Sequence, residues 1–238
     1  MKKLGVIGGL GPMATVYFLQ LLVQMSQART DQEHMEILLH SVPQIPDRTG
    51  YIIGKSKENP LPLMAETGRK LVSHGAEVIA IPCITAHFFQ QQLEAEIGVP
   101  VLNAIEETLL TLQTACIERV GLMATDGTVQ SGLFQKALET AGISCVLPCE
   151  EGQKQVMHII YEEVKAGKTV NLPLFQETAE ELFRQDAQVV LLGCTELSLI
   201  KRDHPLRPGF LDVLEVLARK AVCTCGTIKP EYEKLITE

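Results

Sequence analysis

The sequence lacks two features that would connect it to nucleic acid or to a membrane. Among 238 residues it has no dense basic run, since 21 Lys and Arg stand against 29 Asp and Glu for a net charge of −8. A phosphate backbone is bound by clustered Lys and Arg, so we expect no nucleic-acid partner. No apolar stretch is long enough to span a bilayer, so we expect no membrane association.

The sequence also lacks a secretion signal and a zinc-ligand pattern. Its apolar start breaks at glycines and continues into a helical pattern without a cleavage-like site, which predicts a cytoplasmic protein. Seven cysteines are an odd number, and disulfides are not expected in that compartment. No His or second Cys pair stands at zinc spacing around the Cys145/Cys149 or Cys223/Cys225 pairs, so we expect no metal, and Cys116 is predicted to be a small core residue.

Strands and helices alternate along the chain, which predicts an α/β fold with parallel sheets. We expect strands at 4–7, 36–40, 78–82, 99–102, 120–124, 143–147, 189–192 and 208–212. We expect helices from near Met13 and over 61–74, 87–97, 151–165, 172–185 and 212–223, and a Pro-rich irregular loop over 41–50.

The series of elements occurs twice. The strand and glycine turn that begin at Gly5 are repeated at Gly121, and Cys83 and Cys194 follow these glycines by 78 and 73 positions. This predicts two similar doubly wound lobes related by pseudo-two-fold symmetry, with the active site in the cleft between them. We assign 1–103 plus 212–238 to the first lobe, which carries Cys83, and 104–211 to the second, which carries Cys194.

The two cysteines each end a buried apolar strand just before a helical segment. Parallel sheets bind ligands at the carboxyl ends of their strands, and a helix start lowers the pKa of a thiol. Two matched thiols suit the removal of a proton from one face of a carbon and the return of a proton to the other, which inverts a stereocentre. Cys83 with His87 as base would instead suggest a single-nucleophile enzyme such as a hydrolase.

The glycine turn after the first strand formally matches a dinucleotide fingerprint from Gly9 through Gly11 to Ala14. Pro12 removes a backbone N–H there, and His40 and Ser41 stand where an acidic residue would bind the ribose. We therefore expect Gly9 and Gly11 to let the backbone approach a small anionic ligand instead.

Six motifs together resemble the aspartate/glutamate racemase superfamily, and most of all its aspartate racemase branch, over nearly the whole chain. These motifs are Gly8-Gly9-Leu10-Gly11-Pro12, Pro46-Asp47-Arg48-Thr49, Pro82-Cys83-x-Thr85-Ala86-His87, Ala124-Thr125-x-Gly127-Thr128, Tyr161-Glu162-x-Val164-Lys165-x-Gly167 and Gly193-Cys194-Thr195-Glu196-Leu197. The resemblance implies proton transfer at the α-carbon of an acidic amino acid, without metal, pyridoxal phosphate or nucleotide, in a homodimer.

The resemblance also implies roles for individual residues. Cys83 and Cys194 would be the acid and base, and Arg48 and Lys165 would bind the side-chain carboxylate of aspartate. The α-carboxylate or α-amino group would be bound by Thr85, Thr125, Thr128 and Thr195, and Glu196 completes the predicted substrate-binding set.

One residue departs from the pattern of that superfamily. Ile84 stands where the superfamily has Asn, and an isoleucine side chain cannot form a hydrogen bond. Aspartate is the expected substrate, with glutamate or a broader set of amino acids as the near alternative. A related isomerase or decarboxylase with one productive cysteine, and a non-catalytic amino-acid-binding protein on the same fold, remain alternatives.

Overall fold

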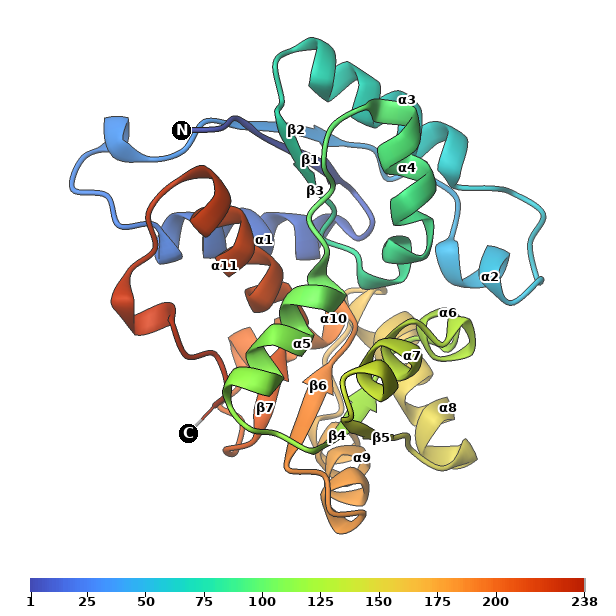
Figure 1. Ribbon diagram of the computed structural model, residues 1–238. Coiled ribbons are helices and arrows are strands. Elements are labelled where there is room, and N and C mark those ends of the chain that lie inside the picture. The colour runs from blue at the N-terminus through green and yellow to red at the C-terminus, as the bar shows by residue number, and fades with distance from the viewer. Residues whose placement is uncertain (238) are drawn as a thin grey trace.

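Two parallel sheets, one in each half of the chain, organise the molecule (Figure 1). The computed structural model describes residues 1–237. The first sheet has the order β2-β1-β3, from β1 (Leu4–Gly8), β2 (Ile37–Ser41) and β3 (Val78–Ala80). The second has the order β5-β4-β6-β7, from β4 (Arg119–Met123), β5 (Ser144–Val146), β6 (Val189–Leu192) and β7 (Phe210–Asp212). The predicted α/β fold with two parallel-sheet lobes is confirmed.

The two sheets share one strand order. In each, the first strand of the half is central, the second strand pairs on one side and the third on the other. Because all these pairs are parallel, the carboxyl ends of the strands meet at one edge of each sheet. Cys83 follows β3 and Cys194 follows β6, so the two cysteines occupy equivalent places.

Helices cover both faces of each sheet. They are α1 (Pro12–Met25), α2 (Arg48–Ile52), α3 (Leu61–Ser73), α4 (Gln90–Ile97), α5 (Ala104–Thr114), α6 (Asp126–Ser131), α7 (Leu133–Thr140), α8 (Glu150–His158), α9 (Leu172–Arg184), α10 (Thr195–Asp203) and α11 (Val213–Cys225). A π-helix spans Ile159–Val164, and 3-10 turns span Asp31–Glu33, Ile84–Phe89 and Pro230–Tyr232.

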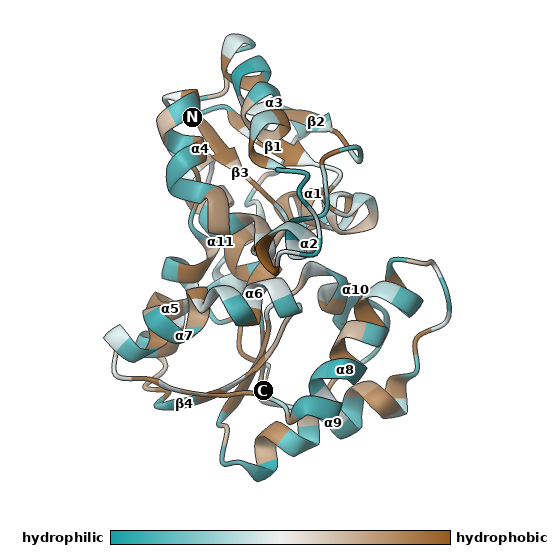
Figure 2. Ribbon diagram, turned by 90° about the vertical axis from the view of Figure 1, so that its right-hand side faces the viewer, coloured by the Kyte–Doolittle hydropathy of each residue, from teal (hydrophilic) through white to brown (hydrophobic). Residues whose placement is uncertain are grey.

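Strands β1 and β3 are brown in Figure 2 because they consist mainly of hydrophobic residues, and their residues are buried, whereas the edge strands β2 and β5 are partly exposed. Successive side chains of a strand point to opposite faces. Leu4 and Val6 accordingly join a core shared with the second sheet, whereas Ile7 joins a separate core under α3. In the second sheet Leu122 belongs to the shared core and Met123 to a third core under α9.

The last helix returns to the first half of the chain, as predicted. Helix α11 packs against α1 of the first half and against α5. The shared core therefore runs through the helices between the two sheets. The exact limits of the two lobes, at 103/104 and 211/212, stay a prediction. Across residues 1–237, no helix has the length and apolar character needed to cross a membrane.

Two local predictions were wrong. The strand expected over 99–102 is only a single bridge between Val101 and Ile79, because Pro100 has no N–H and Asn103 already caps α5. Cys116 is exposed, not buried, since it stands after the end of α5 with a φ of 54°.

Three further elements differ at their limits. The helix expected from position 87 is preceded by a 3-10 turn that begins at Ile84, directly after the cysteine. The helix expected over 151–165 changes to a π-helix at Ile159. The irregular loop after β2 ends early, because Asp47 caps α2 by accepting a hydrogen bond from the N–H of Gly50.

Candidate active site

The two cysteines line one small chamber between the sheets, which we call the inner chamber. Cys83 is 6% exposed and Cys194 is 5% exposed. The inner chamber is lined by Leu10, Asp47, Arg48, Thr49, Cys83, Ile84, Thr85, Thr125, Tyr161, Lys165, Cys194, Thr195 and Glu196. Its volume is about 10 Å³. That is roughly the space of one water molecule, so a larger ligand enters only when the walls move apart.

Eight residues of the predicted site line the inner chamber, and three do not. The eight are Arg48, Cys83, Thr85, Thr125, Lys165, Cys194, Thr195 and Glu196. Thr128 lies behind the wall and contacts Thr85 and Thr125. Gly9 and Gly11 line a neighbouring cavity instead. The N–H of Gly9 donates to Thr15 Oγ1 at 2.9 Å, so it already has a partner within the protein and is not free to bind a ligand.

Three buried threonine hydroxyls form one end of the site. Thr85 Oγ1 lies 2.9 Å from Thr125 Oγ1 and 3.0 Å from Thr128 Oγ1. Thr85 follows β3 and the other two follow β4, so these hydrogen bonds join the two lobes. Hydroxyl groups can donate or accept, so this end can bind either an α-carboxylate or an α-amino group.

Cys194 lies against a carboxylate. Its Sγ is 2.9 Å from Glu196 Oε2, at the start of α10. Burial raises the pKa of Cys194 well above its usual value, and the Glu196 charge raises it further, while Lys165 acts in the opposite direction. A lowered pKa was expected from the helix start and is wrong for this thiol. The Cys194 thiol is therefore protonated at neutral pH.

Cys83 lies beside a guanidinium group. Arg48 is buried, and its terminal nitrogens donate to the carbonyls of Pro46 and Leu10, each at 3.1 Å. Burial alone would lower the pKa of Arg48, but contact with Cys83 and the charges of Asp47 and Glu196 raise it. Arg48 therefore keeps a positive charge beside the Cys83 sulfur. The Arg48 Nε atom is buried without a partner in the described part of the chain.

Tyr161 and Asp47 also line the inner chamber, although sequence reasoning did not assign them to it. Tyr161 Oη donates to Asp47 Oδ1 at 3.1 Å, which connects the second half of the chain to the first. The Lys165 Nζ atom lies 3.9 Å from the centre of the Tyr161 ring. Tyr161 precedes Lys165 by four positions, and Asp47 adjoins Arg48, so helical spacing and chain proximity were available signals.

Lys165 keeps its charge in this setting. Burial of its ammonium group opposes the charged form, but Glu196 and Cys194 outweigh this effect and raise the pKa of Lys165. The walls of the inner chamber thus include two cations, Arg48 and Lys165, in addition to the threonine hydroxyls.

A second, larger cavity adjoins the inner chamber, and we call it the outer chamber. Its volume is about 420 Å³. Six residues line both chambers and form the boundary between them, namely Leu10, Asp47, Arg48, Tyr161, Lys165 and Glu196.

His87 does not act on the Cys83 thiol. Its Nδ1 lies 3.1 Å from the backbone carbonyl of Cys83, and it does not line the inner chamber. Burial lowers the pKa of His87, so the ring is neutral. A Cys–His nucleophile pair therefore finds no support in this arrangement.

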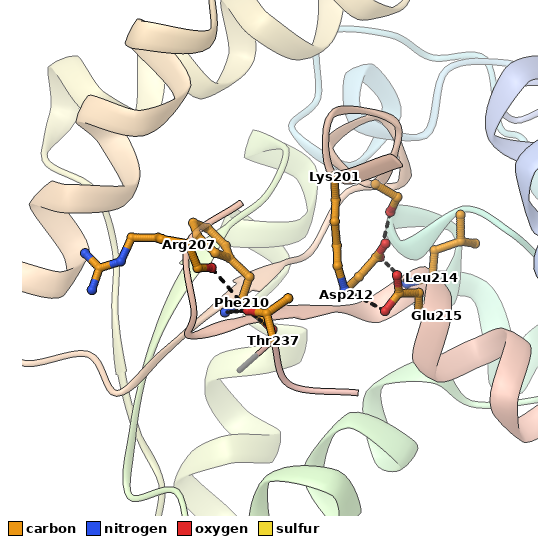
Figure 3. Close-up of polar contacts among 8 residues, drawn as sticks. Lys201, Arg207, Phe210, Asp212, Leu214, Glu215 and Thr237 are labelled. Carbon is orange, nitrogen blue, oxygen red and sulfur yellow. Dashed lines mark hydrogen bonds and ion pairs between the residues drawn. The ribbon is translucent and has the colours of Figure 1, made fainter. Parts of the chain in front are cut away.

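Helix α10, which carries Thr195 and Glu196 on its first turn, is anchored by a buried carboxylate. Asp212, at the end of β7, accepts a hydrogen bond from Ser198 Oγ at 2.7 Å (Figure 3). Lys201 on the same helix forms an ion pair with Glu215 at 2.7 Å. Both contacts hold the Cys194 segment onto α11.

A cavity larger than either chamber lies elsewhere. It measures about 650 Å³ and is bordered by α5, Arg219 and residues 233–236. No three His, Cys, Asp or Glu side chains within residues 1–237 are grouped as a metal site. The convergence of titratable groups at the inner chamber, and not cavity size, therefore marks the candidate active site.

Comparison with known proteins relates this arrangement to racemases. The chain is 30% identical to the aspartate racemase of Picrophilus torridus, with a TM-score of 0.81 and 98% of each chain covered. It is 23% identical over 227 residues to the broad specificity amino-acid racemase RacX of Bacillus subtilis (strain 168), covering 93% of this chain and 97% of the relative. A glutamate racemase from Francisella tularensis, solved with D-glutamate, shares the fold at 18% identity and a TM-score of 0.66, with 94% of this chain and 80% of that chain covered. The family model described as Asp/Glu/hydantoin racemase matches residues 7–221, and the chain belongs to this family.

Proposed function

We propose that this protein is a cofactor-independent amino-acid racemase that uses Cys83 and Cys194 as its two bases. The observation that carries the proposal is that both thiols line the inner chamber from equivalent positions of the two sheets. The relatives named as racemases support the same reaction class. Neither thiol forms a disulfide, and both lie at the carboxyl ends of strands, where ligands bind.

The proposed chemistry balances one proton lost with one proton gained. A thiolate at one cysteine takes the proton from the α-carbon, and the electron pair of the broken C–H bond delocalises into the α-carboxylate. The thiol of the other cysteine then donates a proton to the opposite face. We assign Cys194 as the first proton donor, because its thiol donates a hydrogen bond to Glu196 and is protonated. We assign Cys83 as the first proton acceptor, because the Arg48 guanidinium lies beside it. The reverse reaction exchanges the two roles.

Aspartate is the proposed substrate. Its α-groups would contact the threonine hydroxyls, and its second carboxylate would lie near Arg48 and Lys165, since all these residues except Thr128 line the inner chamber. The unpartnered Arg48 Nε is a donor for that carboxylate. The Ile84 side chain is 1% exposed and packs into the shared core. Because it has no polar atom, it supplies no hydrogen bond to a substrate. Glutamate or a wider set of amino acids is the near alternative, in line with the names of the relatives.

The test compares Cys83→Ala and Cys194→Ala with Cys223→Ala, an exposed cysteine outside the inner chamber. Racemisation of L- and D-aspartate is followed by chiral chromatography, and exchange at Cα is followed by mass spectrometry in D2O. We expect each site variant to lose at least about 100-fold in kcat, while the control keeps the activity of the parent protein.

Full turnover by either site variant would contradict the two-base mechanism. Binding of aspartate without any exchange at Cα in the parent protein would identify an amino-acid-binding protein instead.

A further inference from the structure

Each cysteine of the inner chamber is followed, four positions later, by a buried polar side chain. His87 follows Cys83 and is 4% exposed, and Ser198 follows Cys194 and is fully buried. Neither His87 nor Ser198 lines the inner or the outer chamber. Burial of a polar group costs free energy unless the group forms hydrogen bonds, so the contacts of each side chain indicate what it contributes.

The His87 ring holds the backbone on the carboxyl side of Cys83. Its Nδ1 atom lies 3.1 Å from the carbonyl oxygen of Cys83. A carbonyl can only accept a hydrogen bond, so Nδ1 carries the ring proton and donates it. On the amino side, the N–H of Cys83 donates to the carbonyl of Ile81 at 2.7 Å. The backbone of Cys83 is thus held on both sides, and its sulfur is free to turn only about the Cα–Cβ bond.

Ser198 holds the first turns of α10, which begins directly after Cys194. Ser198 Oγ donates to Asp212 Oδ1 at 2.7 Å. Asp212 pairs in register with Leu192 on β6, and it caps α11 by accepting from the N–H of Leu214. The Ser198 hydroxyl thereby connects the segment after Cys194 to the strand pair that precedes it.

The two side chains make contacts at equivalent places of the two halves. Ser198 contacts the cap residue of α11, while the His87 ring also interacts with the backbone of Leu102, directly before the cap residue Asn103 of α5. Helices α5 and α11 pack against each other. In both halves, therefore, the residue four positions after the cysteine connects the cysteine segment to the start of one of these two helices.

We propose that His87 and Ser198 are positioning residues for the racemisation, His87 for Cys83 and Ser198 for Cys194. This inference rests on the proposed function, because it needs two reacting thiols. Proton transfer between sulfur and carbon requires close approach, and a misplacement of about 1 Å costs up to about 100-fold in rate. Because each residue serves one thiol, the loss of either should impair one proton transfer and leave the other intact.

Deuterium at Cα distinguishes the two proton transfers. Each enantiomer of aspartate loses its α-proton to one cysteine and receives a proton from the other. When one cysteine is displaced, C–H cleavage becomes more rate-limiting for the enantiomer that this cysteine deprotonates, so the deuterium isotope effect on kcat/KM rises. For the opposite enantiomer the later protonation becomes more rate-limiting, so the isotope effect falls.

The test compares His87→Leu and Ser198→Ala with the parent protein. We expect kcat for aspartate to fall about 10- to 100-fold in each variant, with KM changed less than about twofold, because neither residue lines a chamber. The isotope effect should rise for one enantiomer in His87→Leu and for the opposite enantiomer in Ser198→Ala. His87→Asn, whose amide can replace the Nδ1 donor, and Ser198→Thr, which keeps the hydroxyl, should recover most of the activity.

Ser26→Ala is the matched control for the loss of a buried hydroxyl. Ser26 Oγ donates to the carbonyl of Leu22 at 2.7 Å, and Ser26 lines neither chamber. This variant should lower the free energy of unfolding in urea but change neither kcat nor the isotope effects. If His87→Leu does not fold, His87→Gln takes its place, since its amide lies one bond farther from the backbone than the amide of asparagine.

The outcomes separate this inference from the proposed function. If the two variants raise the isotope effect for the same enantiomer, or change it equally for both, the residues do not serve one thiol each and the inference is wrong. Parent-like kcat values in both variants would also contradict it, while the racemase proposal would stand. If the parent protein exchanges no Cα hydrogen of aspartate or glutamate, the proposed function fails and this inference with it.

Discussion

The Sγ atom of Cys194 lies 2.9 Å from the Oε2 atom of Glu196, whereas Cys83 has the Arg48 guanidinium as its charged neighbour. The two thiols are equivalent in the topology of the fold but opposite in their electrostatic surroundings. A carboxylate lies against the first thiol and raises its pKa, whereas the charged neighbour of the second is a cation. This asymmetry is the basis on which we propose different starting roles for the two thiols.

Glu196→Gln should make Cys194 more acidic. The neutral amide removes the negative charge and the carboxylate acceptor that raise the pKa of Cys194, while burial of the thiol remains. We expect the pH midpoint of Cys194 alkylation by iodoacetamide, followed by peptide mass spectrometry, to fall. Exposed Cys223 is an internal control in the same digest. An unchanged midpoint for Cys194 would mean that burial alone sets its pKa.

Gly11→Ala should reduce activity more than stability. A Cβ atom at this position would lie 2.9 Å from Glu196 Oε1 and meets no other neighbour within 4 Å. The φ of −100° suits alanine, so we expect the free energy of unfolding to change by less than about 1 kcal/mol. The displaced carboxylate should lower kcat by about 10- to 100-fold.

Gly226→Ala is the control for this substitution. Its added Cβ would contact Met35 at an ordinary 3.6 Å, and Gly226 does not line the inner chamber. Equal kcat values for Gly11→Ala and the parent protein would show that the position of Glu196 has no part in turnover.

Tyr161 should contribute to aspartate binding through two separable contacts. Tyr161→Phe removes the hydrogen bond to Asp47 but keeps a ring under Lys165, whereas Tyr161→Leu removes both. We expect KM for aspartate to rise a few-fold in the first variant, because a hydrogen bond between the lobes contributes about 1 kcal/mol. KM should rise further in the second, since a cation over a ring adds about 0.5–1 kcal/mol. Identical KM values for the two variants would assign the whole effect to the hydroxyl.

The sequence is informative about the strands and the cysteines because these features are local. Continuous apolar runs ending in small and polar residues predicted β3 and β6, and the repeated spacing placed Cys83 and Cys194 at equivalent ends. Parallel pairing then brings the strand ends to one edge without further information. The strand predicted over 99–102 failed because a pattern of apolar residues does not reveal that α5 already begins at Ala104.

The electrostatic setting of the site could not be predicted, because it depends on contacts between distant segments. Arg48 donates to the carbonyl of Leu10, 38 positions away, and Tyr161 contacts Asp47, 114 positions away. The pKa of Cys194 was misjudged for a similar reason. A helix start lowers the pKa of an exposed thiol, but complete burial beside Glu196 has the larger and opposite effect.

Glu215 should make stability depend on pH. Burial and, to a smaller extent, the neighbouring Asp212 carboxylate raise its pKa from 4.5 to about 7, although Lys201 acts in the opposite direction. A carboxyl with a raised pKa in the folded state stabilises the protein fully below its unfolded pKa, and this contribution is lost as pH rises through the folded value. Between about pH 5 and pH 8, the parent protein should therefore lose on the order of 1–3 kcal/mol of unfolding free energy that Glu215→Gln does not lose.

Urea denaturation across that pH range measures the difference in unfolding free energy, and Glu231→Gln, at an exposed position, is the matched control. The other titratable groups facing Glu215 lie on three elements, with Lys201 on α10, Asp212 on β7 and the neutral Tyr17, whose pKa burial raises, on α1. If Glu215→Gln and Glu231→Gln show the same pH profile as the parent protein, the proton is held by Asp212 and not by Glu215. In that case Asp212→Asn should flatten the profile, because Asp212 is fully buried and its pKa is also raised by burial.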